Sequence, residues 1–238
     1  MSIKSFIYNF KKQIKIMTTP SVYCEIEKLR PTQCAVGMNH VNRKVNELKE
    51  LKENYGVEKV ASFLKSHAAP VVLKDDQVFL IDNHHLCRAL YELGDDYFKD
   101  IPLDSNNITS SKPIMFLNVV SDLSHLNDHT EFWNKMNSEK WVHPYNKNGE
   151  GPVDVNELPK KVSDLENDVF RSIAAVVKIK GGFKKSFIPY AEFQWANYFR
   201  SCFKNKSVDE KDFEKVIDES LNLAKSKDAK HLPGYIDN

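Results

Sequence analysis

The pattern of apolar and polar positions changes sharply within one stretch, Val78–Gly94. Its first four residues are β-branched, aromatic or aliphatic, which is typical of a buried strand. Asp82 and Asn83 follow at once, and either residue can cap a helix. Apolar residues then recur at helical spacing as far as Gly94: Leu86, Ala89, Leu90 and Leu93. The stretch therefore predicts a strand, a tight turn and a helix.

Similar patterns predict the remaining elements. Short apolar runs at residues 22–30, 71–73 and 114–120 are typical of strands, and apolar faces within residues 41–64 indicate two helices. Residues 141–160 are rich in Pro and Gly, which indicates a long irregular connection, and the remainder is helical. We therefore expect an α+β fold with a small mixed β-sheet, flanking helices and a helical C-terminal extension.

These elements suggest three parts of the chain. Residues 1–19 place Ile and Phe on one helical face with lysines around it, so they form a basic amphipathic arm. Such an arm can contact a membrane peripherally or direct the protein to an organelle or out of the cell; a packing helix or a disordered tail is the plainer alternative. Residues 20–140 form the sheet domain, and residues 141–238 form a helical subdomain packed on it.

Composition narrows the class of protein. The chain has 238 residues, a formal net charge of +1 and four widely spaced cysteines. This spacing indicates reduced thiols and a cytoplasmic compartment, because it does not suggest a disulfide framework. No apolar run approaches the length needed to span a bilayer, so we expect a soluble protein. The near-neutral charge gives no support for a nucleic-acid partner.

The predicted turn carries the candidate chemistry. His84, His85 and Arg88 lie on the first turns of the helix, where free backbone N–H groups and the helix dipole favour an anion. Arg88 can add a bidentate contact to a phosphate. The alternative is one buried, hydrogen-bonded histidine beside a surface one. Adjacent histidines are poorly spaced for zinc, and Cys87 has no CxxC companion.

Aromatic residues crowd the segment 189–203, which is predicted to be a helix. Phe193, Phe199 and Phe203, with Ala196 and Tyr198, are interpreted as core rather than as a platform on which bases stack.

Several blocks of the chain resemble a known family. Leu29–Gln33, Val36–Met38, Leu80–Leu90 and Asp168–Ser172 are similar to the ParB-like nuclease family of the wider ParB/sulfiredoxin group, and the likeness extends over about residues 25–235. It implies a ParB/sulfiredoxin-like fold for the sheet domain. The Asp82-Asn83-His84-His85 motif is also similar to that of free serine kinases, which have Gly at the position of Asn83.

The resemblance implies that the turn binds a nucleotide. Asn tolerates the left-handed backbone that Gly would adopt at position 83. Arg88 follows His85 by three residues rather than directly. Cys87 is not in the sulfiredoxin position, which argues against a sulfinic-acid reductase, and no helix-turn-helix for DNA is evident.

Our first hypothesis is a phosphotransferase or nucleotide hydrolase that uses a nucleoside di- or triphosphate and Mg²⁺, with a small-molecule or protein phosphate acceptor. Asp82, His84 and His85 are the candidate catalytic residues, and Asp82 is the candidate Mg²⁺ ligand. Candidate phosphate-binding residues are Thr32, Gln33, Gly37, Asn83, His84, His85 and Arg88. Secondary candidates are His40, Lys44, Lys184 and Lys185.

Two alternatives remain open. A metal-dependent nuclease would use the paired histidines and Asp82 on a phosphodiester. A non-catalytic module would change conformation when a nucleotide binds. Reaction products distinguish these alternatives from the first hypothesis.

Overall fold

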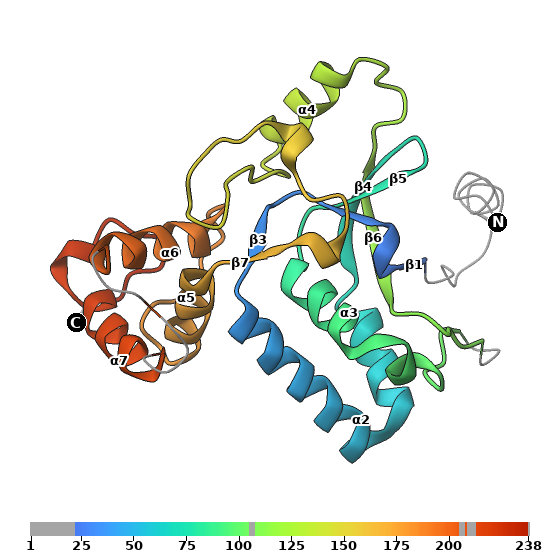
Figure 1. Ribbon diagram of the computed structural model, residues 1–238, viewed down its shortest axis with the longest axis horizontal. Helices are drawn as coiled ribbons and strands as arrows, with labels where there is room; N and C mark the ends of the chain where they lie inside the picture. The colour runs from blue at the N-terminus through green and yellow to red at the C-terminus, as the bar shows by residue number, and fades with distance from the viewer. Residues whose placement is uncertain (1–21, 105–107, 205–207, 209–212, 238) are drawn as a thin grey trace.

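The computed structural model describes residues 22–104, 108–204, 208 and 213–237. Figure 1 shows a β-sheet with helices α2 and α3 against it, and a cluster of helices at one side that contains the C-terminus. The predicted α+β fold, with a small mixed sheet and a helical C-terminal region, is confirmed. The predicted N-terminal arm, residues 1–19, lies outside the described residues.

The main sheet contains parallel and antiparallel neighbours in the order β1-β6-β4-β5-β2. Its strands are β1 (Tyr23–Glu25), β2 (Leu29–Pro31), β4 (Ala69–Lys74), β5 (Gln77–Leu80) and β6 (Ile114–Asp122). Strands β4 and β5 form an antiparallel hairpin, whereas β2 pairs with β5 and β6 pairs with β4 in parallel. Strand β5 therefore lies inside the sheet and ends next to the end of β2.

The two faces of the sheet contact different cores, because successive side chains of a strand point to opposite faces. Val78 and Leu80 of β5 belong to a core shared with α2 and α3, whereas Phe79 between them belongs to a second core. Val71 and Val72 of β4 separate in the same way.

Helices α2 (Met38–Ser66) and α3 (His84–Phe98) pack on each other and cover the first face. Each is interrupted by a glycine with positive φ: Gly56 at 79° and Gly94 at 71°. Other residues rarely adopt this conformation, so the glycines allow the breaks. The two helices predicted within residues 41–64 are therefore the two halves of α2, and Gly94 interrupts α3 where the sequence predicted its end.

The second face is covered by α4 (His129–Ser138) and the connection that follows it. Phe132 and Met136 of α4, with Val142 and Leu158, pack against Phe79. The connection also contains short 3₁₀ turns at Val155–Glu157 and Val162–Asp164 and the strand β7 (Glu166–Asn167), which pairs in parallel with β3 (Ala35–Val36).

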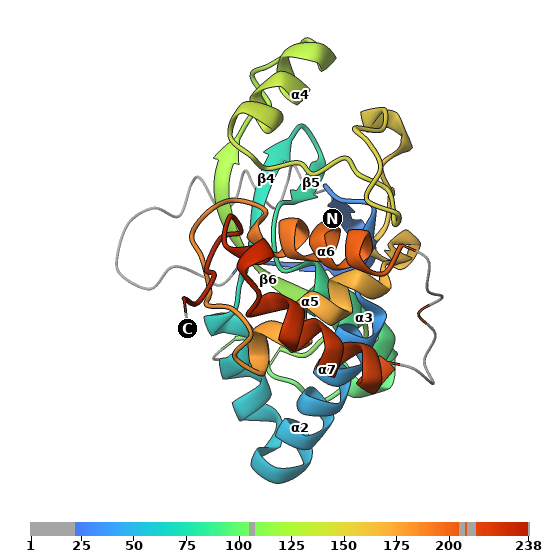
Figure 2. The same cartoon turned by 90° about the vertical axis from the view of Figure 1, so that its left-hand side faces the viewer.

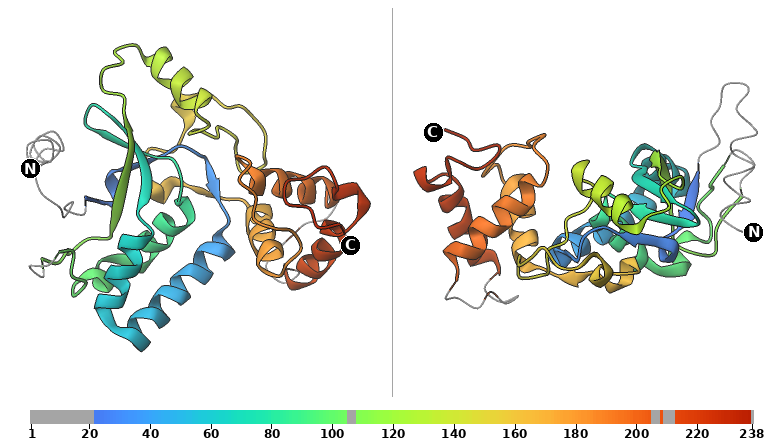
Figure 3. Two further views of the ribbon diagram at one scale, coloured as in Figure 1. Left: turned by 180° about the vertical axis from the view of Figure 1, so that it is seen from behind. Right: turned by 90° about the horizontal axis from the view of Figure 1, so that it is seen from above.

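A third core joins α5 (Val169–Ile179), α6 (Ala191–Cys202) and α7 (Phe213–Ala224). Trp195 is fully buried at its centre, stacks on Phe183 and donates from its indole N–H to the Pro233 carbonyl. Figure 2 shows these helices in front of the sheet, and the view from above in Figure 3 shows them at the opposite end of the molecule from β1. Ala196, Phe199 and Phe203 are core residues, as predicted.

The residues of the three cores can be compared with the three predicted parts of the chain. Val142 and Leu158 pack with the second face of the sheet, and Val162 and Leu165 pack with the first. The side chains of the C-terminal core begin at Val169, and the division at residue 140 stays a prediction. Within the described ranges, no helix is long and apolar enough to cross a membrane.

Candidate functional site

The turn between β5 and α3 has the conformation that the sequence suggested. Asn83 is the N-cap of α3 with φ 63° and ψ 23°, a left-handed conformation that Asn tolerates. Its backbone N–H donates to the Asp82 carboxylate at 2.7 Å, and its side-chain amide donates to the His67 carbonyl at 3.1 Å. The Asn83 side chain makes no capping hydrogen bond to the first N–H groups of α3. The helix N-terminus therefore remains open to a ligand.

The two histidines that follow hydrogen-bond α3 to the segment between β2 and α2. The Nε2 atom of His84 accepts the backbone N–H of Thr32 at 3.2 Å, and the Nε2 atom of His85 accepts that of Gly37 at 3.0 Å. The Thr32 hydroxyl also donates to the Leu80 carbonyl at 2.8 Å. The histidines therefore hold the segment after β2 against the turn, and His84 is the buried, hydrogen-bonded histidine of the alternative interpretation.

These contacts determine the protonation of both rings. Since each Nε2 accepts a hydrogen bond, the neutral ring carries its proton on Nδ1. Burial and the positive charge of Arg171 lower the pKa of His84 to about 3. The same two causes hold the pKa of His85 well below its usual value of 6.5. Both rings are thus neutral at pH 7, and His85 can donate from Nδ1 but cannot take up a proton at Nε2.

A cavity of about 680 Å³ opens beside this turn, between the sheet and the C-terminal helices. The predicted site residues that line it are Thr32, Gln33, His40, Lys44, Asp82, Asn83, His84, His85 and Lys185. The ring of His40 lies 5.0 Å from that of His85, with an edge-to-face orientation. The cavity therefore brings together most of the residues that the sequence singled out, including three of the secondary candidates.

Three predicted residues do not line the cavity. The Arg88 guanidinium donates to the carbonyls of Val162, Ser163 and Leu165 and pairs with Glu92, so it supports the fold instead of facing the cavity. Lys184 is likewise absent from the lining. Gly37 contributes through its N–H to His85, and its lack of a side chain allows close approach to Ser172.

Arg171 of α5 is a lining residue that the sequence analysis did not assign to the site. It is buried, with 5% of its surface exposed, and its Nε and Nη1 atoms have no hydrogen-bond partner among the described residues. Its guanidinium lies 3.5 Å from the centre of the Phe193 ring. Desolvation lowers the pKa of Arg171, although Glu192 and Asp168 act in the opposite direction. The signal that could have revealed it is an arginine within the apolar helix α5.

The opposite wall of the cavity is the N-terminus of α6. Tyr190, its N-cap, is left-handed with φ 61° and ψ 20°, and no side chain caps the helix. Tyr190, Ala191, Glu192 and Phe193 all line the cavity, so the N-termini of α3 and α6 both border it. Glu192 forms an ion pair with Lys178. Phe193, interpreted from the sequence as core, is instead partly exposed in the cavity wall.

His143 completes this wall. It follows the loop after α4, its ring centre lies 3.6 Å from that of Phe193, and its backbone N–H donates to the Thr32 carbonyl. Burial lowers the pKa of His143 to about 3 and that of His40 to about 4. The Nδ1 atoms of both rings are buried without a partner among the described residues. Both residues are therefore neutral polar groups facing the cavity.

The unpartnered polar atoms of the described residues are concentrated here. Buried side-chain atoms without a hydrogen bond are found in four residues, and His40, His143 and Arg171 line this one cavity; the fourth is Ser220. Leaving a buried polar group unpaired costs about 1–3 kcal/mol, so native structures rarely retain several together. Such a concentration is typical of a site that a polar ligand completes.

Cationic side chains outnumber acidic ones in the lining. The cationic lining residues are Lys44, Lys140, Arg171, Lys178 and Lys185, and the acidic ones are Asp82 and Glu192. The described residues include no group of three or more His, Cys, Asp or Glu side chains that could hold a metal ion. Asp82 is an exposed carboxylate with one oxygen bonded to the Asn83 N–H. This donor set fits a Mg²⁺ ion that is held mainly by phosphate oxygens and by one carboxylate.

Comparison with known proteins identifies the family. A family model described as "Putative ParB-like nuclease" matches residues 22–201. The chain belongs to this ParB-like family. The crystal structure of protein Atu1540 from Agrobacterium tumefaciens is similar to it with a TM-score of 0.69 and 31% sequence identity, over 90% of this chain and 97% of that one. No curated protein matches the chain. The predicted resemblance to ParB-like proteins is therefore confirmed.

Proposed function

We propose that this ParB-like protein is a nucleotide-binding phosphotransferase or nucleotide hydrolase whose cavity between α3 and α6 holds the phosphate groups. The observation that carries the proposal is the buried Arg171, which lines the cavity and has two unpartnered nitrogens, together with the unpartnered His40 and His143 in the same lining. Two donors on a charged group require an acceptor of negative charge, and phosphate oxygens supply it.

The walls of the cavity support an anion with several charges. The N-termini of α3 and α6 both border it, and each offers unpaired backbone N–H groups and the positive end of a helix dipole. Lys44, Lys140 and Lys185 line it without an ion pair to any described residue. A single phosphate would engage one helix end, whereas a di- or triphosphate can engage both.

The residues of the turn then have distinct roles. His85 donates from Nδ1 to a phosphate oxygen, since its Nε2 is occupied by Gly37. His84 is a positioning residue because its Nε2 holds Thr32. Asp82 would hold Mg²⁺ against the phosphates, and the ion would offset the charge that develops during phosphoryl transfer. His40 lines the same cavity and is neutral at pH 7, so it would accept the proton of an attacking hydroxyl or water.

The experiment measures binding and products with the full-length protein. Tripolyphosphate, ATP, GTP, CTP and UTP are titrated by calorimetry in phosphate-free buffer with Mg²⁺, and the reaction mixtures are then resolved by anion-exchange chromatography. We expect saturable binding and the release of a nucleoside di- or monophosphate. Asp82→Asn should retain tripolyphosphate binding in the absence of Mg²⁺ but lose turnover.

The outcomes separate the alternatives. Absence of binding by tripolyphosphate and by all nucleotides would remove the proposed anion site. Nicked or shortened DNA or RNA, without nucleotide turnover, would favour the nuclease activity that the family description names. Saturable nucleotide binding without any product would favour a non-catalytic module that responds to the nucleotide.

A further inference from the structure

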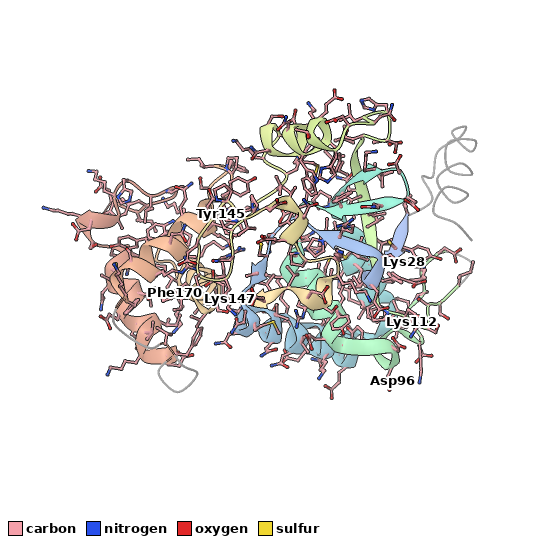
Figure 4. The ribbon with its side chains drawn as sticks, turned by 45° about the horizontal axis from the view of Figure 1, so that its top comes forward. Lys28, Asp96, Lys112, Tyr145, Lys147 and Phe170 are labelled. Carbon is pink, nitrogen blue, oxygen red and sulfur yellow. The ribbon has the colours of Figure 1, made fainter. Side chains whose placement is uncertain are left out.

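A second cavity, of about 620 Å³, adjoins the proposed phosphate cavity. The two share the side chains of Lys140, His143, Tyr190 and Phe193. The second cavity lies between α4, α6 and the connection after α4, and Figure 4 shows Tyr145 of this connection near the junction with the C-terminal helices. A ligand anchored in the first cavity therefore lies next to the second.

The charge of the second cavity differs from that of the first. Among its lining residues Lys140 is the one cation, since His143 is neutral, and none is acidic. Its exposed amides, Asn134 and Asn137 of α4 and Gln194 of α6, make no side-chain hydrogen bond to any described residue. The lining therefore suits a neutral group with several hydrogen-bond donors and acceptors.

Aromatic rings supply the other part of the lining. Trp133, Tyr145 and Tyr190 border the cavity with Phe193. Trp133 contacts Phe79, Phe132 and His129, and none of these pairs is stacked. The Phe193 ring, in contrast, already contacts both Arg171 and His143, so it does not offer a free face. Rings beside free amides are the combination that proteins use to hold a planar base.

We infer that the second cavity holds the base of the nucleotide whose phosphates occupy the first cavity. The base stacks on the rings of Trp133 or Tyr145. Asn137 and Gln194 bond to its edge, because an amide both donates and accepts hydrogen bonds. The inference rests on the proposed function and adds to it the part of the substrate that is recognised. An apolar group in this place would leave the amides unpaired.

Comparing a nucleotide with its bare phosphate chain tests the inference. Tripolyphosphate probes the first cavity alone, and nucleoside triphosphates probe both. We expect at least one triphosphate to bind roughly tenfold to a hundredfold more tightly than tripolyphosphate, the range for one base stacked on an aromatic side chain. Asn137→Ala and Gln194→Ala should each weaken that triphosphate about tenfold and leave tripolyphosphate unchanged.

The variants are chosen to preserve the fold. Asn137 and Gln194 are exposed, whereas Trp133 packs in the second core and its removal would disturb α4. Asn222→Ala is the matched control, since Asn222 is an exposed amide on α7 and lines neither cavity. It should change neither affinity.

Three results would overturn the inference. If every triphosphate binds no more tightly than tripolyphosphate, the base is not recognised, although the phosphate site stands. If a triphosphate binds more tightly but Asn137→Ala and Gln194→Ala leave its affinity unchanged, the base lies elsewhere. If neither tripolyphosphate nor any triphosphate binds, the proposed function fails and the inference fails with it.

Discussion

Replacing Arg171 by Met should stabilise the protein without ligand and weaken its binding of phosphate. The arginine is buried with two unpartnered nitrogens, each of which costs about 1–3 kcal/mol. Met has a similar length and no polar hydrogen. The substitution loses the contact of the guanidinium with Phe193, which is worth about 0.5–2 kcal/mol. The nearby carboxylates keep partners, because Asp168 pairs with Arg200 and Glu192 pairs with Lys178.

Together the two unpartnered nitrogens cost about 2–6 kcal/mol, so after the loss of the Phe193 contact the net stabilisation at the centre of these ranges is about 3 kcal/mol. For a chain of this length, each kcal/mol corresponds to about 2–4 °C in the melting temperature. Binding should change in the opposite direction. Loss of a charged hydrogen-bond donor costs roughly 1.5–3 kcal/mol, which corresponds to a 10- to 150-fold weaker affinity for tripolyphosphate. Removing a residue that only supports the fold would not produce this combination.

Urea unfolding in phosphate-free buffer measures the first effect, and calorimetric titration with tripolyphosphate measures the second. Arg88→Met is the matched control. Arg88 donates to three backbone carbonyls and lines neither cavity, so its loss should lower the free energy of unfolding and leave the affinity unchanged. The reasoning is refuted if Arg171→Met destabilises the chain as Arg88→Met does, or if tripolyphosphate binds the two variants equally well.

Three further predictions follow from the burial of other residues. Burial lowers the pKa of His84 from 6.5 to about 3, so the unfolded chain binds more protons than the folded one between these pH values. From this residue alone, the free energy of unfolding should be fully retained above pH 6.5 and fall by about 1.4 kcal/mol per pH unit below it. Urea midpoints that do not change between pH 7 and 4.5 would contradict this. Trp195→Ala should cost about 3–5 kcal/mol in urea unfolding, because the side chain is fully buried; a loss below 1 kcal/mol would show that the third core tolerates the cavity. Gly37→Ala should destabilise by about 1–3 kcal/mol, since the added methyl group would overlap the Ser172 backbone; a melting temperature equal to that of wild type would show that α2 and α5 can separate there.

The strand, turn and helix from β5 to α3 could be predicted from the sequence because their signals are local. The apolar run of β5, the Asp82-Asn83 pair and the apolar face before Gly94 all lie within one stretch. Arg88 illustrates the limit of this reasoning. Helical spacing correctly placed it one turn after His84, but its guanidinium is directed to the carbonyls of residues 162–165. Nothing local in the sequence indicates that this segment packs beside α3.

Arg171 and His143 were missed for a related reason. Each gains its significance from neighbours that are distant in the sequence: Arg171 lies against Phe193, and His143 hydrogen-bonds through its backbone to Thr32. An arginine within an apolar helix is a weak signal, because a terminal guanidinium commonly reaches solvent along its own aliphatic chain. Only the packing of α5 against α2 and α6 shows that this one does not.

Two helix N-termini border the phosphate cavity, and only one of them could be predicted from the sequence. Asn83 and Tyr190 have nearly the same left-handed backbone, with φ of 63° and 61°, and neither helix has a side-chain cap. Asn commonly adopts this conformation, so the first helix start could be anticipated, whereas a left-handed tyrosine is unusual. The Tyr190 hydroxyl donates to the Val142 carbonyl and ties α6 to the connection after α4. The strained N-cap is thus held by a tertiary contact, and that contact brings the second helix end to the cavity.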